Sequence, residues 1–137
     1  MVLLAALLVF SGSAWAQDYN HVTVDVFKDW LEGKHSMHIV DIQPEKEFAA
    51  KHFAGSISTA AFPVETDEQR ARLDKGAEAY AKDNRDVVII CPRGKKGAQR
   101  TYDYLKSKGV LENRLFILAG GMASWPHDAL LIKEKQN

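Results

Sequence analysis

A single cysteine stands at the start of a short, cationic, glycine-containing segment. Cys91 follows Val87–Ile90, four consecutive β-branched aliphatic residues, which are typical of a strand buried on both faces. Three cations lie among the next five residues, and a helical pattern begins at Gly97. Loop amides and the positive end of a helix hold anions well and stabilise a thiolate. The spacing therefore predicts a nucleophilic cysteine beside an anion-binding loop.

A buried, inert cysteine at a strand end is the alternative interpretation. Two glycines and three cations would add nothing to the packing of such a thiol, because charged side chains stay solvated rather than cover a core. We therefore predict Cys91 as the catalytic residue. The residues predicted to bind an anionic substrate are Arg93, Gly94, Lys95, Lys96, Gly97 and Ala98.

The sequence gives only weak support for a phosphatase loop, a nucleotide-binding loop or a metal site. Gly97 occupies the sixth position after Cys91, where the Cys-x5-Arg phosphate loop of tyrosine phosphatases has arginine, and the loop lacks the Walker pattern for nucleotide phosphates. His35 and His38 are spaced to share a metal, but no Cys-x-x-Cys or His-Glu-x-x-His accompanies them. We expect no metal and no organic cofactor.

The elements that position Cys91 alternate between strand and helix. A short extended piece at 21–23 precedes helical patterns that end near 32 and extend over 44–50, 66–82 and 97–108, and strand patterns lie at 38–42, 55–58, 86–91 and 114–118. Thr23 or Asp25 can cap the first helix, and Thr66-Asp67-Glu68-Gln69 is a capping sequence for the third. Such alternation predicts an α/β fold with one parallel sheet of about five strands and helices on both faces. Strand 86–91 should lie at the centre of this sheet, and Cys91 at its carboxyl edge, where open α/β sheets bind ligands.

Three ordered motifs resemble the rhodanese-like sulfurtransferase family over roughly residues 21–125. The first motif is Val40-Asp41-Ile42 followed by Glu47-Phe48 and His52-Phe53-Ala54-Gly55-Ser56-Ile57; the second is Cys91-x-x-Gly94; the third is Leu118-Ala119-Gly120-Gly121 with Trp125. The resemblance implies that a single rhodanese-like domain moves a sulfane sulfur from a donor such as thiosulfate, through a persulfide on Cys91, to a thiol or cyanide. A non-catalytic sulfur carrier or partner-binding module and a thiol redox sensor are the alternatives.

The chain departs from the family pattern at three positions. Lys96 and Gly97 stand where the family often has Arg and then Ser or Ala, and the loop region is about one residue longer than usual. Gln43 replaces the arginine that commonly follows Asp-x, which leaves Asp41 without its customary neighbour. These departures affect the expected donor preference more than the expected fold. We expect His52 to fix a turn rather than act as a catalyst, and Trp125 to pack in the core or at the sheet edge.

The balance of charges and the N-terminal residues indicate which partners and which cellular location to expect. The 137 residues carry 18 Lys and Arg against 18 Asp and Glu, which argues against nucleic acid as a partner, since such domains carry a basic excess.

Residues 1–16 have no charge and are typical of an export signal, with the apolar run Val2–Phe10 and the cleavage sequence Ala14-Trp15-Ala16. The run is too short to span a bilayer. We thus expect a domain at 17–137, periplasmic or secreted, without a membrane anchor after cleavage and monomeric.

Cleavage of the exported protein is predicted after Ala16, which makes Gln17 the first mature residue. Ala14-Trp15-Ala16 is the Ala-x-Ala sequence that directly follows the apolar run. The intact mass of protein recovered from the periplasm or medium measures this directly. Soluble protein that retains residues 1–16 in the cytoplasm would contradict the prediction.

Overall fold

The central element of the protein is a parallel sheet. A computed structural model describes residues 18–134. Its five-stranded sheet has the order β1-β6-β5-β2-β4, and every neighbouring pair is parallel. The strands are β1 (His21–Val22), β2 (Met37–Asp41), β4 (Ile57–Ser58), β5 (Asp86–Ile90) and β6 (Leu115–Leu118). The predicted fold class is confirmed, and β5 lies at the centre of the sheet as its aliphatic run indicates.

Strand β5 contributes side chains to two hydrophobic cores, one on each face of the sheet. Val87 and Ile89 pack into the core on one face of the sheet, and Val88 and Ile90 into the core on the other. All four side chains are fully buried, because side chains alternate between the faces of a strand. This double burial explains why the strand is an unbroken aliphatic run rather than an alternation of apolar and polar residues.

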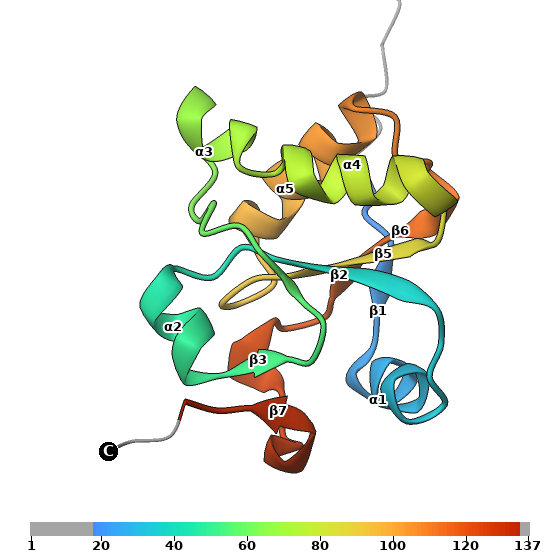
Figure 1. Ribbon diagram of the computed structural model, residues 1–137, viewed down its shortest axis with the longest axis vertical. Helices are drawn as coiled ribbons and strands as arrows, with labels where there is room; N and C mark the ends of the chain where they lie inside the picture. Colours follow the sequence, from blue (N-terminus) through green and yellow to red (C-terminus); the bar gives the residue numbers. More distant parts are fainter. Residues whose placement is uncertain (1–17, 135–137) are drawn as a thin grey trace, which may run out of the picture.

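Helices cover both faces of the sheet. Figure 1 shows α3 (Asp67–Ala71), α4 (Asp74–Asp83) and α5 (Lys96–Ser107) on one side, and α1 (Val24–Glu32) and α2 (Glu45–Ala50) on the other. Helix α1 begins after Thr23, one of the two predicted caps, whose hydroxyl accepts the N–H of Val26. The fully buried Phe27 anchors α1 to its core.

The prediction of one helix over 66–82 is wrong. Thr66 does form the predicted capping box with Gln69, but the chain divides into α3 and α4 around Leu73. Leu73 is fully buried, whereas α3 buries none of its side chains. The break lets α4 lie close to the sheet, where Gly76 packs against the Val40 side chain.

A second, small sheet is absent from the sequence-based prediction. Strands β3 (His52–Phe53) and β7 (Leu131–Ile132) pair antiparallel. Trp125 lies against Phe27 and Phe53 with edge-to-face ring geometry, which confirms its predicted packing role. Three short 3-10 helices complete the described chain: η1 (Glu112–Arg114), η2 (Met122–Ser124) and η3 (Asp128–Leu130).

The two histidines considered as metal ligands have other partners. His35 Nε2 lies 2.8 Å from an Asp86 oxygen, and His38 Nε2 lies 2.7 Å from an Asp83 oxygen. Within residues 18–134, no group of three or more potential ligand side chains gathers around a metal-sized site. No helix in the same range has the length and apolar character needed to cross a membrane.

Asp41 is a buried carboxylate at the end of β2. Its two oxygens accept the backbone N–H and the side-chain Nε2–H of Gln43, at 2.8 and 2.9 Å. Gln43 Nε2 also donates to the Lys51 carbonyl at 3.1 Å. Burial raises the pKa of Asp41 to about 6, because the neutral Gln43 donors only partly oppose the loss of hydration. Gln43 thus supplies hydrogen bonds where the family pattern commonly supplies a cation.

The raised pKa of Asp41 predicts how acid affects stability. The folded protein binds this proton more tightly than the unfolded chain, so ionised Asp41 lowers the free energy of unfolding above about pH 6, and the loss is recovered as pH falls towards 4. Between about pH 7 and pH 4.5, the free energy of unfolding of wild type minus that of Asp41→Asn should rise by about 2 kcal/mol. Urea titrations measure this, with the exposed Asp25→Asn as control. Parallel pH dependences of wild type and Asp41→Asn would contradict it.

Candidate functional site

Cys91 lies at the carboxyl edge of the sheet, directly after β5. Cys91 is only 2% exposed, yet it lines a cavity of about 580 Å³. The backbone N–H of Gly94 donates to Cys91 Sγ over 2.6 Å. The thiol thus lies at the bottom of a cavity with a backbone dipole directed at it.

The residues after Cys91 leave the start of α5 open. Lys95 is the N-cap residue of α5 and makes no side-chain capping bond, and the first turn holds no acidic residue. Helices are normally stabilised there by a capping oxygen or an acidic side chain. Lys96, in the first turn, instead adds a positive charge to the positive end of the helix. An anion bound in the cavity would supply both the missing hydrogen-bond acceptor and the missing negative charge at the start of α5.

The third motif holds the loop that contains Cys91. The backbone N–H of Met122 donates to the Cys91 carbonyl and that of Ala123 to the Pro92 carbonyl, both over 2.9 Å. Gly121 has φ +60°, and a Cβ there would lie 2.6 Å from Gly94 N. Glycine is therefore required, because two stretches of backbone approach each other with no room for a side chain.

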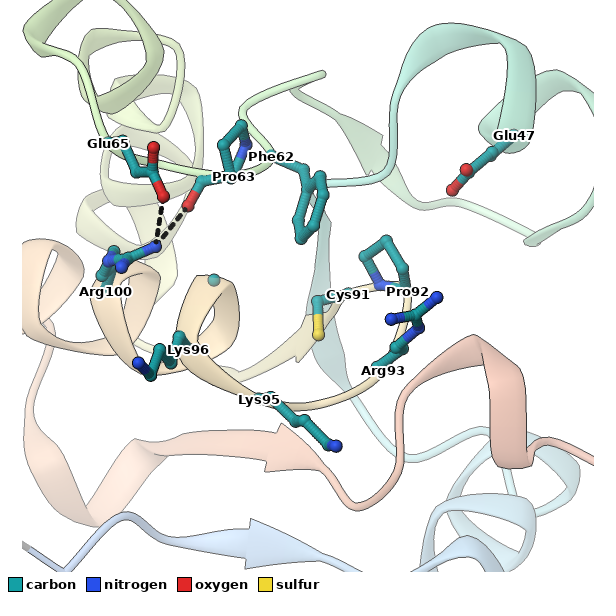
Figure 2. A pocket seen from close by; sticks show the side chains of 11 residues that line it. Glu47, Phe62, Pro63, Glu65, Cys91, Pro92, Arg93, Lys95, Lys96 and Arg100 are labelled. Carbon is teal, nitrogen blue, oxygen red and sulfur yellow. Dashed lines mark hydrogen bonds and ion pairs between the residues drawn. The ribbon is translucent and has the colours of Figure 1, made fainter.

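The predicted cations gather around the cavity. Arg93, Lys95 and Lys96 line it, and all three are exposed. No acidic side chain within residues 18–134 forms a salt bridge with any of them, whereas Arg100 donates to the Pro63 carbonyl and to Glu65 at 3.2 and 3.3 Å (Figure 2). The three loop cations therefore keep their charge available to an anion.

The other predicted binding residues have distinct places. Gly97 lines the cavity, and Gly94 reaches the sulfur through its amide. Ala98 is fully buried in the core and does not line the cavity. The structure therefore does not bring Ala98 to the cavity with the other predicted binding residues.

Besides Pro92 and Arg100, which lie in the loop and the helix that follow Cys91, four residues of the cavity were not predicted as site residues. Glu47 comes from α2, and Phe62, Pro63 and Glu65 come from the segment between β4 and α3. Glu47 belongs to the first motif, so the resemblance could have indicated it. The other three carry no local signal, because the chain brings them to the cavity from some thirty residues before Cys91.

His52 has a local structural role. Its Nδ1 lies 2.8 Å from the Phe48 carbonyl, and its ring stacks on Phe48 with centroids 4.1 Å apart. The imidazole thereby joins the end of α2 to β3. This agrees with the prediction that His52 fixes a turn rather than acts as a catalyst.

Comparison with known proteins assigns the family. The model of the rhodanese-like domain matches residues 23–128, so the chain belongs to the rhodanese-like domain family. A comparison with the sequences of curated proteins gives no significant match.

Solved structures share the fold at low sequence identity. A Staphylococcus saprophyticus protein, SSP1007, is similar with a TM-score of 0.60 and 23% identity, over 81% of this chain and 97% of its own. Yeast Ygr203w, described as a protein tyrosine phosphatase of the rhodanese family, has a TM-score of 0.60 and 17% identity over 80% and 85%. A thiosulfate sulfurtransferase from Pseudomonas aeruginosa has a TM-score of 0.62 and 17% identity over 86% of this chain and 20% of its own.

Proposed function

We propose that the protein is a sulfurtransferase that accepts a sulfane sulfur on Cys91 and passes it to a thiol or cyanide. The donor is a small sulfur anion such as thiosulfate. The observation that carries the proposal is the Cys91 thiol at the base of a cavity, with the Gly94 N–H directed at the sulfur and three loop cations, Arg93, Lys95 and Lys96, among the residues that line it. Membership of the rhodanese-like family supports the same chemistry.

The proposed reaction is a displacement at sulfur. The Cys91 thiolate attacks the outer sulfur of thiosulfate; a bond forms between the two sulfurs, and the bond within thiosulfate breaks, with its electron pair leaving on sulfite. The resulting persulfide carries one negative charge, which backbone N–H groups of the loop and of the α5 N-terminus can stabilise. An acceptor thiolate or cyanide then attacks the terminal sulfur, and Cys91 leaves as thiolate. No external oxidant is needed.

A sulfur carrier without turnover and a thiol redox sensor are the competing functions. Both use a reactive Cys91, but they differ in what the cysteine takes up. A carrier gains one sulfur from thiosulfate and releases it only to a particular partner, whereas a redox sensor gains none. The intact mass after incubation with thiosulfate separates the sensor from the other two functions, and thiocyanate production from cyanide separates the enzyme from the carrier.

Phosphatase activity is not favoured, although one structural neighbour is described as a phosphatase. A phosphatase loop uses an arginine at the sixth position after its cysteine to hold phosphate oxygens, and Gly97 stands there. Arg100, the next arginine in the chain, is engaged by Glu65 and the Pro63 carbonyl.

We also propose that the protein is exported and works in the periplasm or outside the cell. The signal sequence and its cleavage after Ala16 lie outside the described residues, so the proposal rests on the sequence pattern. In such an oxidising compartment Cys91 would have no second thiol in this sequence with which to close an internal disulfide.

Replacement of Cys91 tests the proposed function. Cys91→Ser should keep the fold, because a hydroxyl is nearly isosteric with the thiol and can still accept the Gly94 N–H. It should abolish thiocyanate production from thiosulfate and cyanide, because serine cannot form a persulfide. Circular dichroism reports the fold in the same samples. Substantial turnover by the folded variant would place the chemistry elsewhere.

Removal of two loop cations tests the attraction of the donor. Lys95→Ala with Lys96→Ala should lower kcat/KM for thiosulfate by about tenfold at low salt, because the side chains raise the local concentration of a dianion. The loss should shrink as salt rises, since the Debye length is roughly 8 Å at physiological ionic strength. Stability should change little, because the lysines are exposed.

A matched control removes the same charge elsewhere. Lys34 and Lys82 are exposed and precede β2 and β5, at the opposite edge of the sheet. Lys34→Ala with Lys82→Ala should leave kcat/KM close to wild type. Equal effects of the two double variants, or a loss that is the same at every salt concentration, would exclude steering by Lys95 and Lys96.

A further inference from the structure

The cavity above Cys91 has two unlike sides. One side carries the loop cations Arg93, Lys95 and Lys96, and the other is formed by Phe62, with Pro63 and Pro92 nearby. Figure 2 shows the Phe62 ring pointing into the cavity above Cys91, with Arg100 and Glu65 beyond it. The volume of the cavity, about 580 Å³, lies within the range of roughly 300–1,000 Å³ that is typical of sites for organic ligands. A compact inorganic anion would leave the apolar side without a contact.

Phe62 is held in this exposed position by the backbone. Its N–H donates to the Ile42 carbonyl over 2.9 Å, which fixes the segment to the end of β2. Ala60 and Val64 flank it with positive φ values of 50° and 64°, a conformation that a β-branched residue such as Val64 rarely adopts. The Phe62 residue remains 39% exposed. The chain thus adopts an unfavourable backbone and leaves an aromatic ring partly in water, at the mouth of the cavity.

Gly97 makes room for this ring. A Cβ at Gly97 would lie 3.1 and 3.2 Å from the Phe62 ring carbons Cδ2 and Cε2, which is closer than side chains normally pack. The ring therefore lies directly on the first turn of α5, beside the loop residues that line the cavity. The glycine that departs from the family pattern and the exposed aromatic residue form one structural unit.

We propose that Phe62, seated on Gly97, sets the donor specificity of the site. It favours sulfur donors whose anionic head carries a flat apolar group over donors that lack one. The cations and loop amides hold the head, and the Phe62 ring contacts the apolar group, because aromatic rings attract one another beyond the area they bury. This inference rests on the proposed sulfurtransferase function.

An aryl thiosulfonate has the required chemistry. The Cys91 thiolate attacks its outer sulfur; the new bond joins the two sulfurs, and the bond to the sulfonyl sulfur breaks, with its electron pair leaving on the aryl sulfinate. Two negative charges enter the step, one on each reactant, and two leave it, on the persulfide and the sulfinate. The apolar group stays on the leaving fragment.

The test compares two donors that share a head group. Benzenethiosulfonate carries a ring and methanethiosulfonate carries a methyl group, and kcat/KM for persulfide formation on Cys91 is measured for each by single-turnover kinetics and intact mass. Phe62→Ala should lower the ratio of the two values by about tenfold relative to wild type. Phe62→Leu, which keeps apolar bulk without a flat ring, should give an intermediate ratio, and Phe62→Tyr should retain it. Leu111→Ala, which removes another exposed apolar side chain (59%), is the control.

Gly97→Ala provides an independent test with Phe62 present. The new methyl group must displace the ring, so the ratio should fall in this variant as well. In a Phe62→Ala background the same change should have no further effect on the ratio, because the ring through which it acts is gone.

The outcomes separate this inference from the proposed function. If thiosulfate or either organic donor loads Cys91 but Phe62→Ala and Phe62→Leu keep the wild-type ratio, the specificity proposal is overturned and the sulfurtransferase proposal stands. Loading by thiosulfate alone, with neither organic donor accepted, also overturns only the specificity proposal. If no donor loads wild-type Cys91, the proposed function fails and this inference fails with it.

Discussion

The backbone contact between the Gly120-Gly121 turn and the loop after Cys91 is the constraint on which the site depends. Two N–H groups, from Met122 and Ala123, occupy the carbonyls of Cys91 and Pro92. With those carbonyls turned towards the end of β6, the Gly94 N–H donates to the Cys91 sulfur. Parallel pairing of β5 with β6 brings the two segments to the same edge, so sheet register positions the nucleophile, and a side chain at Gly121 would separate them.

The site keeps several local features that lower the stability of the folded domain. Helix α5 begins without a capping side chain, and Lys96 places a cation at its positive end, both of which lower helix stability. Val64 and Ala60 adopt positive φ values, and the Phe62 ring stays partly exposed. The uncapped, cationic start of α5 and the Phe62 ring meet at one cavity, and an occupant that is anionic on one side and apolar on the other would improve both. The stability of the sheet and its two cores makes the deficits tolerable.

Replacement of a cation by Gln43 changes the environment of Asp41 more than its position. Two Gln43 donors hold the carboxylate in place, so the end of β2 keeps its geometry. Hydrogen bonds from a neutral amide compensate a buried charge less fully than an ion pair does, and the pKa of Asp41 rises to about 6. The motif therefore survives as a structural element while its charge balance differs from the family pattern.

The sequence by itself determined the fold class, the central strand, the catalytic candidate and the loop cations, because these are encoded locally: a β-branched run, the residues that follow it, and helix boundaries such as Thr23. The break at Leu73, the pairing of β3 with β7, and the apolar side of the cavity were decided only by tertiary structure. Each depends on residues far apart in the chain: Leu73 is drawn into a core that α4 and the sheet create, and Phe62 reaches Gly97 across thirty-five positions. Local propensity and periodicity carry no information about such contacts, because their free energy arises only when the sheet has brought the segments together.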